Sequence, residues 1–149
     1  MISGDFAHFW AWFGCLYLVL LTIQDFKNKM YVDDRYNSIM MGLSIALIHF
    51  SSRPIWLVFG SIFIIVILRW LLLKLKVIGE ADINSLSWIL FGFSIIDMSY
   101  LFMFTLYFLA ASGLYYLFKL AIFKYKGDSP FYHVLLVAFS LTVFIFKLY

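Results

Sequence analysis

The stretch INSLSWILFGFSIIDMSYLFMFTLYFLAASGLYYLFKLAIF, residues 83–123, carries only two charged residues, Asp97 and Lys119. An α-helix rises about 1.5 Å per residue, and the hydrocarbon core of a bilayer is about 30 Å thick. The stretch is therefore too long for one membrane-spanning helix. We predict that it folds back at residues 97–99, with a short helix over 83–97 and a longer one over 100–123.

Four more apolar runs lie on either side of this stretch, over residues 6–24, 38–50, 54–74 and 131–147. In lipid, backbone polar groups find partners only within helices or closed barrels, and these runs read as helices. Short loops between them favour tight packing. The sequence thus predicts an all-α integral membrane protein, a compact bundle of six transmembrane helices that forms a single domain over residues 1–149.

Composition supports the same class, because 65% of the residues are hydrophobic and only 13% are charged. The net charge of +3 comes with 11 lysines and arginines spread over short loops, which form no basic stripe for nucleic acid. Cys15 is the only cysteine, so neither an internal disulfide nor a multi-cysteine zinc site is expected. The three histidines are far apart in sequence, and we expect no metal site and no cofactor.

The basic residues predict an orientation, because cytoplasmic loops of membrane proteins are enriched in lysine and arginine. Eight of them lie at one predicted membrane edge and two at the other: Lys27, Lys29, Arg35, Lys74, Lys76, Lys119, Lys124 and Lys126 against Arg53 and Lys147. The first edge is predicted to be cytoplasmic, with both chain termini outside. Arg69 falls within the third span, where its long side chain could reach the same cytoplasmic edge.

Two acidic residues, Asp25 and Asp82, each lie where an apolar run meets a group of lysines. If the helices alternate in direction, both carboxylates belong to the cytoplasmic edge. A charge near hydrocarbon is costly to keep, and paired carboxylates can activate water for hydrolysis. The second and fourth helices are expected to be short, which would let water and an extended chain reach this pair.

The residues around both aspartates resemble the motifs of a known protease family. Residues 25–32, DFKNKMYV, resemble the first aspartate motif of type IV prepilin and archaeal preflagellin peptidases, in which basic residues such as Lys27 follow the aspartate. Residues 79–82 are similar to the GxGD signature of these intramembrane aspartyl proteases and comprise Gly79, Glu80, Ala81 and Asp82. A weaker likeness is the sequence SPF at residues 129–131, which is similar to an element near the end of the family's core.

The resemblance implies that the chain is a membrane aspartyl endopeptidase with Asp25 and Asp82 as its catalytic residues. Its substrate would be a prepilin-like or preflagellin-like protein, whose short basic leader is removed at the cytoplasmic face of the cell membrane. The chain departs from the family pattern at Ala81, where glycine is usual, and at Asn84, where many relatives have lysine. It is similar to the minimal members of the family, so no methyltransferase activity is expected.

The residues alone leave two other functions open. The acids could serve as proton or cation sites in a small transporter, although such sites usually lie near the middle of the bilayer. The chain could also be a noncatalytic membrane component of a secretion machine. Gly79 could be only a turn or packing residue, and Glu80, Asp33 and Asp34 could be solvated loop charges.

Overall fold

The computed structural model describes residues 4–27, 35–51, 54–75, 80–118 and 131–145. Six helices account for almost all of this part of the chain, as the sequence predicts. They are α1 (Gly4–Lys27), α2 (Arg35–Phe50), α3 (Ile55–Leu75), α4 (Glu80–Ile96), α5 (Met98–Phe118) and α6 (Phe131–Ile145). The predicted helical residues 119–123 and 146–147 lie outside the described residues.

Only three of these helices, α1, α3 and α5, are long and apolar enough to cross a membrane on their own. The prediction of six transmembrane helices is therefore met by length and composition in three of the six described helices. Helices α2, α4 and α6 have 16, 17 and 15 residues, which gives them a rise of about 23 to 26 Å against a hydrocarbon thickness of about 30 Å.

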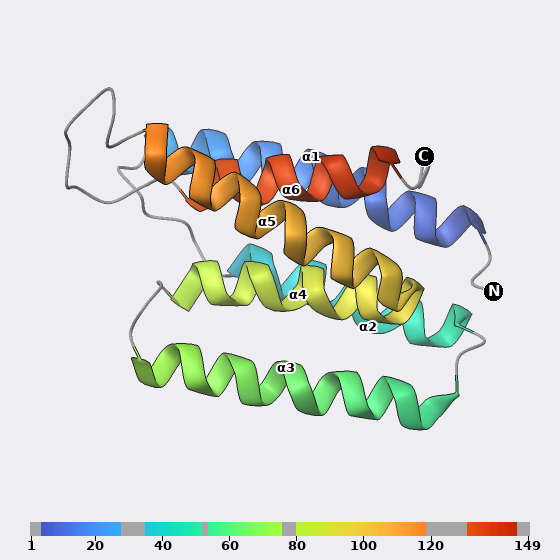
Figure 1. Ribbon diagram of the computed structural model, residues 1–149. Helices are drawn as coiled ribbons and strands as arrows, with labels where there is room; N and C mark the ends of the chain where they lie inside the picture. Colours follow the sequence, from blue (N-terminus) through green and yellow to red (C-terminus); the bar gives the residue numbers. More distant parts are fainter. Residues whose placement is uncertain (1–3, 28–34, 52–53, 76–79, 119–130, 146–149) are drawn as a thin grey trace.

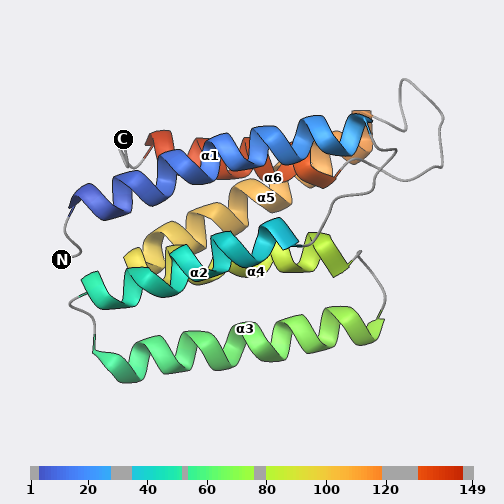
Figure 2. The same cartoon turned by 180° about the vertical axis from the view of Figure 1, so that it is seen from behind.

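Successive helices run in opposite directions, so all six are roughly antiparallel to their neighbours in sequence (Figure 1). The start of α1 and the end of α6 lie at one end of the bundle, and the view from behind shows the same arrangement (Figure 2). Helix α4 lies at the centre and packs against α2, α3, α5 and α6, whereas α1 packs against α2 and α6. The opposite end of the bundle, which holds the end of α1 and the start of α4, is called the α4-start end below.

The core of the bundle is a cluster of aromatic side chains from α1, α4, α5 and α6. The Trp10 ring lies 5.9 Å from Trp88, 5.4 Å from Phe93 and 5.5 Å from Phe139, measured between ring centres. Phe104 of α5 extends the cluster, with its ring 5.5 Å from that of Phe93. All five side chains are fully buried. Large interlocking rings of this kind fix the helices in one arrangement.

Glycine at position 92 makes this packing possible. A Cβ atom placed there would lie 2.6 Å from Cη2 and 2.7 Å from Cε2 of Trp10, closer than real Cβ contacts come. The indole N–H of Trp10 donates to the Ser44 hydroxyl at 2.9 Å, which further restricts the position of the ring. A side chain larger than hydrogen at position 92 would therefore force the Trp10 ring to move within a closely packed core.

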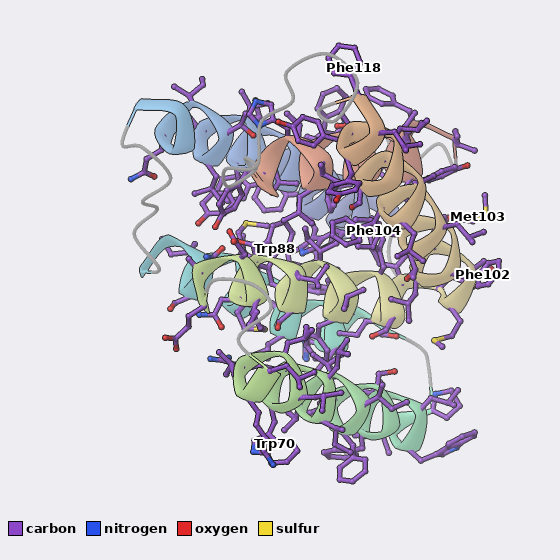
Figure 3. The ribbon with its side chains drawn as sticks, turned by 60° about the vertical axis from the view of Figure 1, so that its left-hand side comes forward. Trp70, Trp88, Phe102, Met103, Phe104 and Phe118 are labelled. Atoms are coloured by element: carbon purple, nitrogen blue, oxygen red, sulfur yellow. The ribbon has the colours of Figure 1, made fainter. Side chains whose placement is uncertain are left out.

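The outer helices present an apolar surface. In α3 and in α5, only 6% of the apolar segment that could cross a membrane is buried inside the structure. Figure 3 shows Trp88 and Phe104 directed into the bundle, whereas Trp70 of α3 and Phe102 of α5 point away from it. Exposed apolar area of this extent is unusual on a soluble monomer and is ordinary for a protein in lipid.

The boundary between α4 and α5 falls at Asp97, within the predicted fold-back at residues 97–99. The Asp97 carboxylate accepts a hydrogen bond from the backbone N–H of Ser99 at 2.8 Å, and its carbonyl oxygen accepts one from the N–H of Tyr100 at 3.1 Å. An aspartate in this position caps the start of the following helix. The one charged residue in the middle of the long apolar stretch thus ends one helix and begins the next.

Candidate functional site

Asp82 lies in the first turn of α4 and is half-buried. The sequence predicts a helix that starts at residue 83, but α4 starts at Glu80 and includes both acids of this motif. Carboxylates are stabilised in a first helical turn because the exposed N–H groups and the helix dipole favour negative charge. This explains why α4 starts at Glu80 and not at residue 83.

Asp25 lies in the last turn of α1, which continues three residues beyond the predicted end at residue 24 and ends at Lys27. The side chains of Asp25 and Lys27 lie outside the described part of the structure. A carboxylate near the C-terminal end of a helix is opposed by the helix dipole, where a basic residue would be favourable. Helix capping therefore gives no reason for an aspartate at position 25, in contrast to position 82.

A buried polar cluster of Asn37, Ser85 and Tyr132 lies one helical turn from Asp82. The Ser85 hydroxyl is 2.8 Å from the Asn37 carbonyl oxygen Oδ1, 3.0 Å from the Ala81 carbonyl oxygen and 3.1 Å from the Tyr132 hydroxyl. The Asn37 amide also donates to the Ala81 carbonyl oxygen at 3.1 Å. Because a serine hydroxyl has one proton and can also accept, these contacts form a connected network.

This network joins three helices at the α4-start end, because Asn37 belongs to α2, Ser85 to α4 and Tyr132 to α6. Their exposed fractions are 3%, 0% and 2%, so the network lies in a low-dielectric interior, where hydrogen bonds are strong. It fixes the first turn of α4, including the Ala81 carbonyl group beside Asp82. The backbone that carries the Asp82 side chain is thus held in place from two neighbouring helices.

Sequence reasoning missed Asn37, Ser85 and Tyr132. One signal was present, because residues three apart share a helix face and Ser85 follows Asp82 by three positions within an apolar run. Asn37 and Tyr132 carried no such signal, since their places beside Ser85 depend on how α2 and α6 pack against α4.

The ends of α1 and α4 that carry Asp25 and Asp82 lie at the same end of the bundle (Figures 1 and 2). Helices α2 and α6 both pack against α1 and α4, and Asn37 and Tyr132 join them to the start of α4 at this end. Of the other predicted site residues, Glu80 is exposed and Ala81 is half-buried, and Gly79 lies outside the described residues. Within the described ranges, no three histidine, cysteine, aspartate or glutamate side chains come together as a metal centre would require.

No protein-family model, curated protein or solved structure matches this chain. The likeness to the prepilin and preflagellin peptidases therefore depends on short sequence motifs, those around Asp25 and Asp82 and the weaker one at residues 129–131.

Proposed function

We propose that the chain is an aspartyl endopeptidase of the cell membrane that removes the short basic leader from prepilin-like or preflagellin-like proteins. Asp25 and Asp82 are its catalytic residues. The observation that carries the proposal is the place of Asp82, which is half-buried above a fixed polar network at the end of the bundle where α1 brings Asp25.

Lipid surrounds the bundle in this proposal, and α1, α3 and α5 cross it. The exposed apolar surfaces of α3 and α5 support this placement. Helices α2, α4 and α6 are shorter than α1, α3 and α5. Their first turns can therefore lie deeper in the membrane than the ends of α1, α3 and α5 on the same side. Water and an extended peptide would then approach Asp82 from the cytoplasm, the side to which the excess of lysine and arginine assigns this end.

The chemistry follows from two carboxyl groups that come close together in a partly dry site. Because two neighbouring carboxylates repel each other, the pair holds one proton across the neutral range. The ionised carboxylate takes a proton from water as the water oxygen attacks the scissile carbonyl carbon. The protonated carboxyl donates its proton to the carbonyl oxygen, which gives a tetrahedral gem-diol. The carboxyl that took the water proton then passes it to the amine nitrogen as the carbon–nitrogen bond breaks, and the other carboxylate regains its proton from a gem-diol hydroxyl.

Either aspartate of such a pair can act as the base toward water, while the other acts as the acid toward the carbonyl oxygen.

Cleavage of a coexpressed leader-bearing protein tests the function. Asp25→Asn and Asp82→Asn are each expected to lower the cleavage rate by about a thousandfold, because each removes one partner of a general acid–base pair. The control is Asp5→Asn, an exposed aspartate in the first turn of α1 at the far end of the bundle. It should cleave at the rate of the unmodified protein.

Retained cleavage in either asparagine variant would reject the assignment, provided that the variant inserts into the membrane at the normal level. Transport activity offers a separate check. Proton or cation flux in vesicles that depends on Asp25 and Asp82, with no cleavage by the unmodified protein, would favour a transporter instead.

A further inference from the structure

A cavity of about 330 Å³ lies between α2, α3 and α4 at the α4-start end. Its polar wall is formed by Arg69 of α3, Asn84 of α4 and Asn37 with Ser38 of α2. One turn further into the bundle, α2 contributes Met41 and Gly42 as an apolar wall. A volume of this size is at the lower end of the range for small-molecule sites, about 300 to 1,000 Å³.

The cavity contains the positive charge of Arg69. This residue is half-buried in α3, whose one other charged residue is Lys74 in the last turn, and within the described part of the chain no carboxylate forms a salt bridge with it. A guanidinium group in such a place is costly unless an anion or water meets it. Its planar array of N–H donors matches the oxygens of a phosphate group.

The depth of Arg69 agrees with that of a lipid phosphate. Arg69 precedes the last residue of α3, Leu75, by six positions, a rise of about 9 Å that the long arginine side chain can largely span. The next residue, Trp70, is exposed, and the Lys74 ammonium group lies 4.9 Å from the centre of its ring. Tryptophan and lysine together mark the headgroup level of a bilayer.

We propose that this cavity binds the headgroup of an anionic phospholipid. Arg69 bonds the phosphate oxygens, the amide groups at the polar wall lie beside the headgroup, and the start of one acyl chain follows the apolar wall past Gly42. The cavity is open at Gly42, since no atom lies within 4 Å of a Cβ placed there. The positive charge would repel a basic leader peptide, so the site differs from the seat of the proposed substrate, and the inference does not depend on the proposed peptidase activity.

Native mass spectrometry of the full-length protein in a neutral detergent tests the lipid site. The ligands are dioleoyl phosphatidylglycerol, dioleoylglycerol, which lacks the phosphate, and glycerol phosphate, which lacks the tails. We expect one tightly held phosphatidylglycerol molecule and weaker binding of the other two. Arg69→Gln should weaken phosphatidylglycerol binding by about tenfold or more, because it removes charge-assisted hydrogen bonds.

Three further variants separate the cavity itself from a general effect of charge. Gly42→Leu fills the cavity while leaving Arg69 in place, and it should also weaken binding by about tenfold. Gly60→Leu is its matched control, at another helical glycine with no atom within 4 Å of an added Cβ, far from the cavity on α3. It should bind as the unmodified protein does, and so should Lys74→Gln, which removes an exposed charge outside the cavity.

Unchanged binding in Gly42→Leu would overturn the proposal even if Arg69→Gln failed to fold. Equal loss in Lys74→Gln and Arg69→Gln would overturn it as well, since binding would then reflect the basic surface in general. Binding of dioleoylglycerol as tight as that of phosphatidylglycerol would exclude recognition of the phosphate. Glycerol phosphate bound as tightly as the lipid would assign the cavity to a free phosphate instead.

Discussion

Replacing Gly92 with alanine should destabilise the bundle, although alanine is the better helix former. The added Cβ would lie 2.6 Å from Cη2 and 2.7 Å from Cε2 of Trp10, so the indole ring must move. The ring is fully buried and is held by a hydrogen bond of 2.9 Å to Ser44. Overpacking and loss of this bond together cost about 2 to 5 kcal/mol.

Helix propensity offsets about 0.5 to 1 kcal/mol of that cost, which leaves a net loss of about 1 to 4 kcal/mol in the free energy of unfolding. For a chain of this length, each kcal/mol lowers the melting temperature by about 2 to 4 °C. Cys15, the only cysteine and a half-buried one, allows unfolding to be followed with a thiol-reactive fluorophore during heating.

The matched control is Gly113→Ala on α5, where no atom lies within 4 Å of the added Cβ. It should raise stability by about 0.5 to 1 kcal/mol, because the same change occurs in a helix without a clash. A Gly92→Ala variant that melts at or above the temperature of the unmodified protein would refute the packing argument for Trp10.

Two other substitutions test the cap of α5 and the buried polar network. Asp97→Ala removes the carboxylate that accepts the Ser99 N–H and should cost about 1 kcal/mol, whereas Asp97→Asn can still cap α5 and should cost much less; equal melting temperatures for the two variants would exclude the cap. Ser85→Ala removes a shared partner of Asn37 and Tyr132 and should cost about 1 to 3 kcal/mol. If Ser85 also positions Asp82, cleavage by this variant should slow at temperatures where it remains folded, and a purely structural role would leave that rate unchanged.

Much of the helical architecture could be predicted from the sequence, because apolar runs bounded by charged residues define helices in lipid. Residues 83–123 are the clearest case, where a single internal aspartate locates the break between α4 and α5. Helix lengths were less predictable, since the sequence gives no view of how much of each helix is buried by its neighbours. Helix α4 is mostly buried by its neighbours. A buried helix does not need to cover the full thickness of the lipid, so it can be short.

The candidate site could be predicted only in part. The two aspartates stand out because acids are rare in apolar runs, and Glu80 and Ala81 follow from the motif around Asp82. The polar network could not be predicted, because the bonds of Ser85 to Asn37 and Tyr132 join residues 48 and 47 positions apart. Contacts between residues so far apart in the sequence depend on how α2, α4 and α6 pack together. Local sequence patterns do not predict this packing.

A double-mutant cycle of the cleavage rate tests most directly whether Asp25 and Asp82 act as one pair. Asp25→Asn, Asp82→Asn and the double variant should all lose activity to the same extent, about a thousandfold, because either loss already removes the shared proton and its acceptor. Losses that multiply in the double variant, or a single variant that cleaves within tenfold of the unmodified protein, would contradict the account.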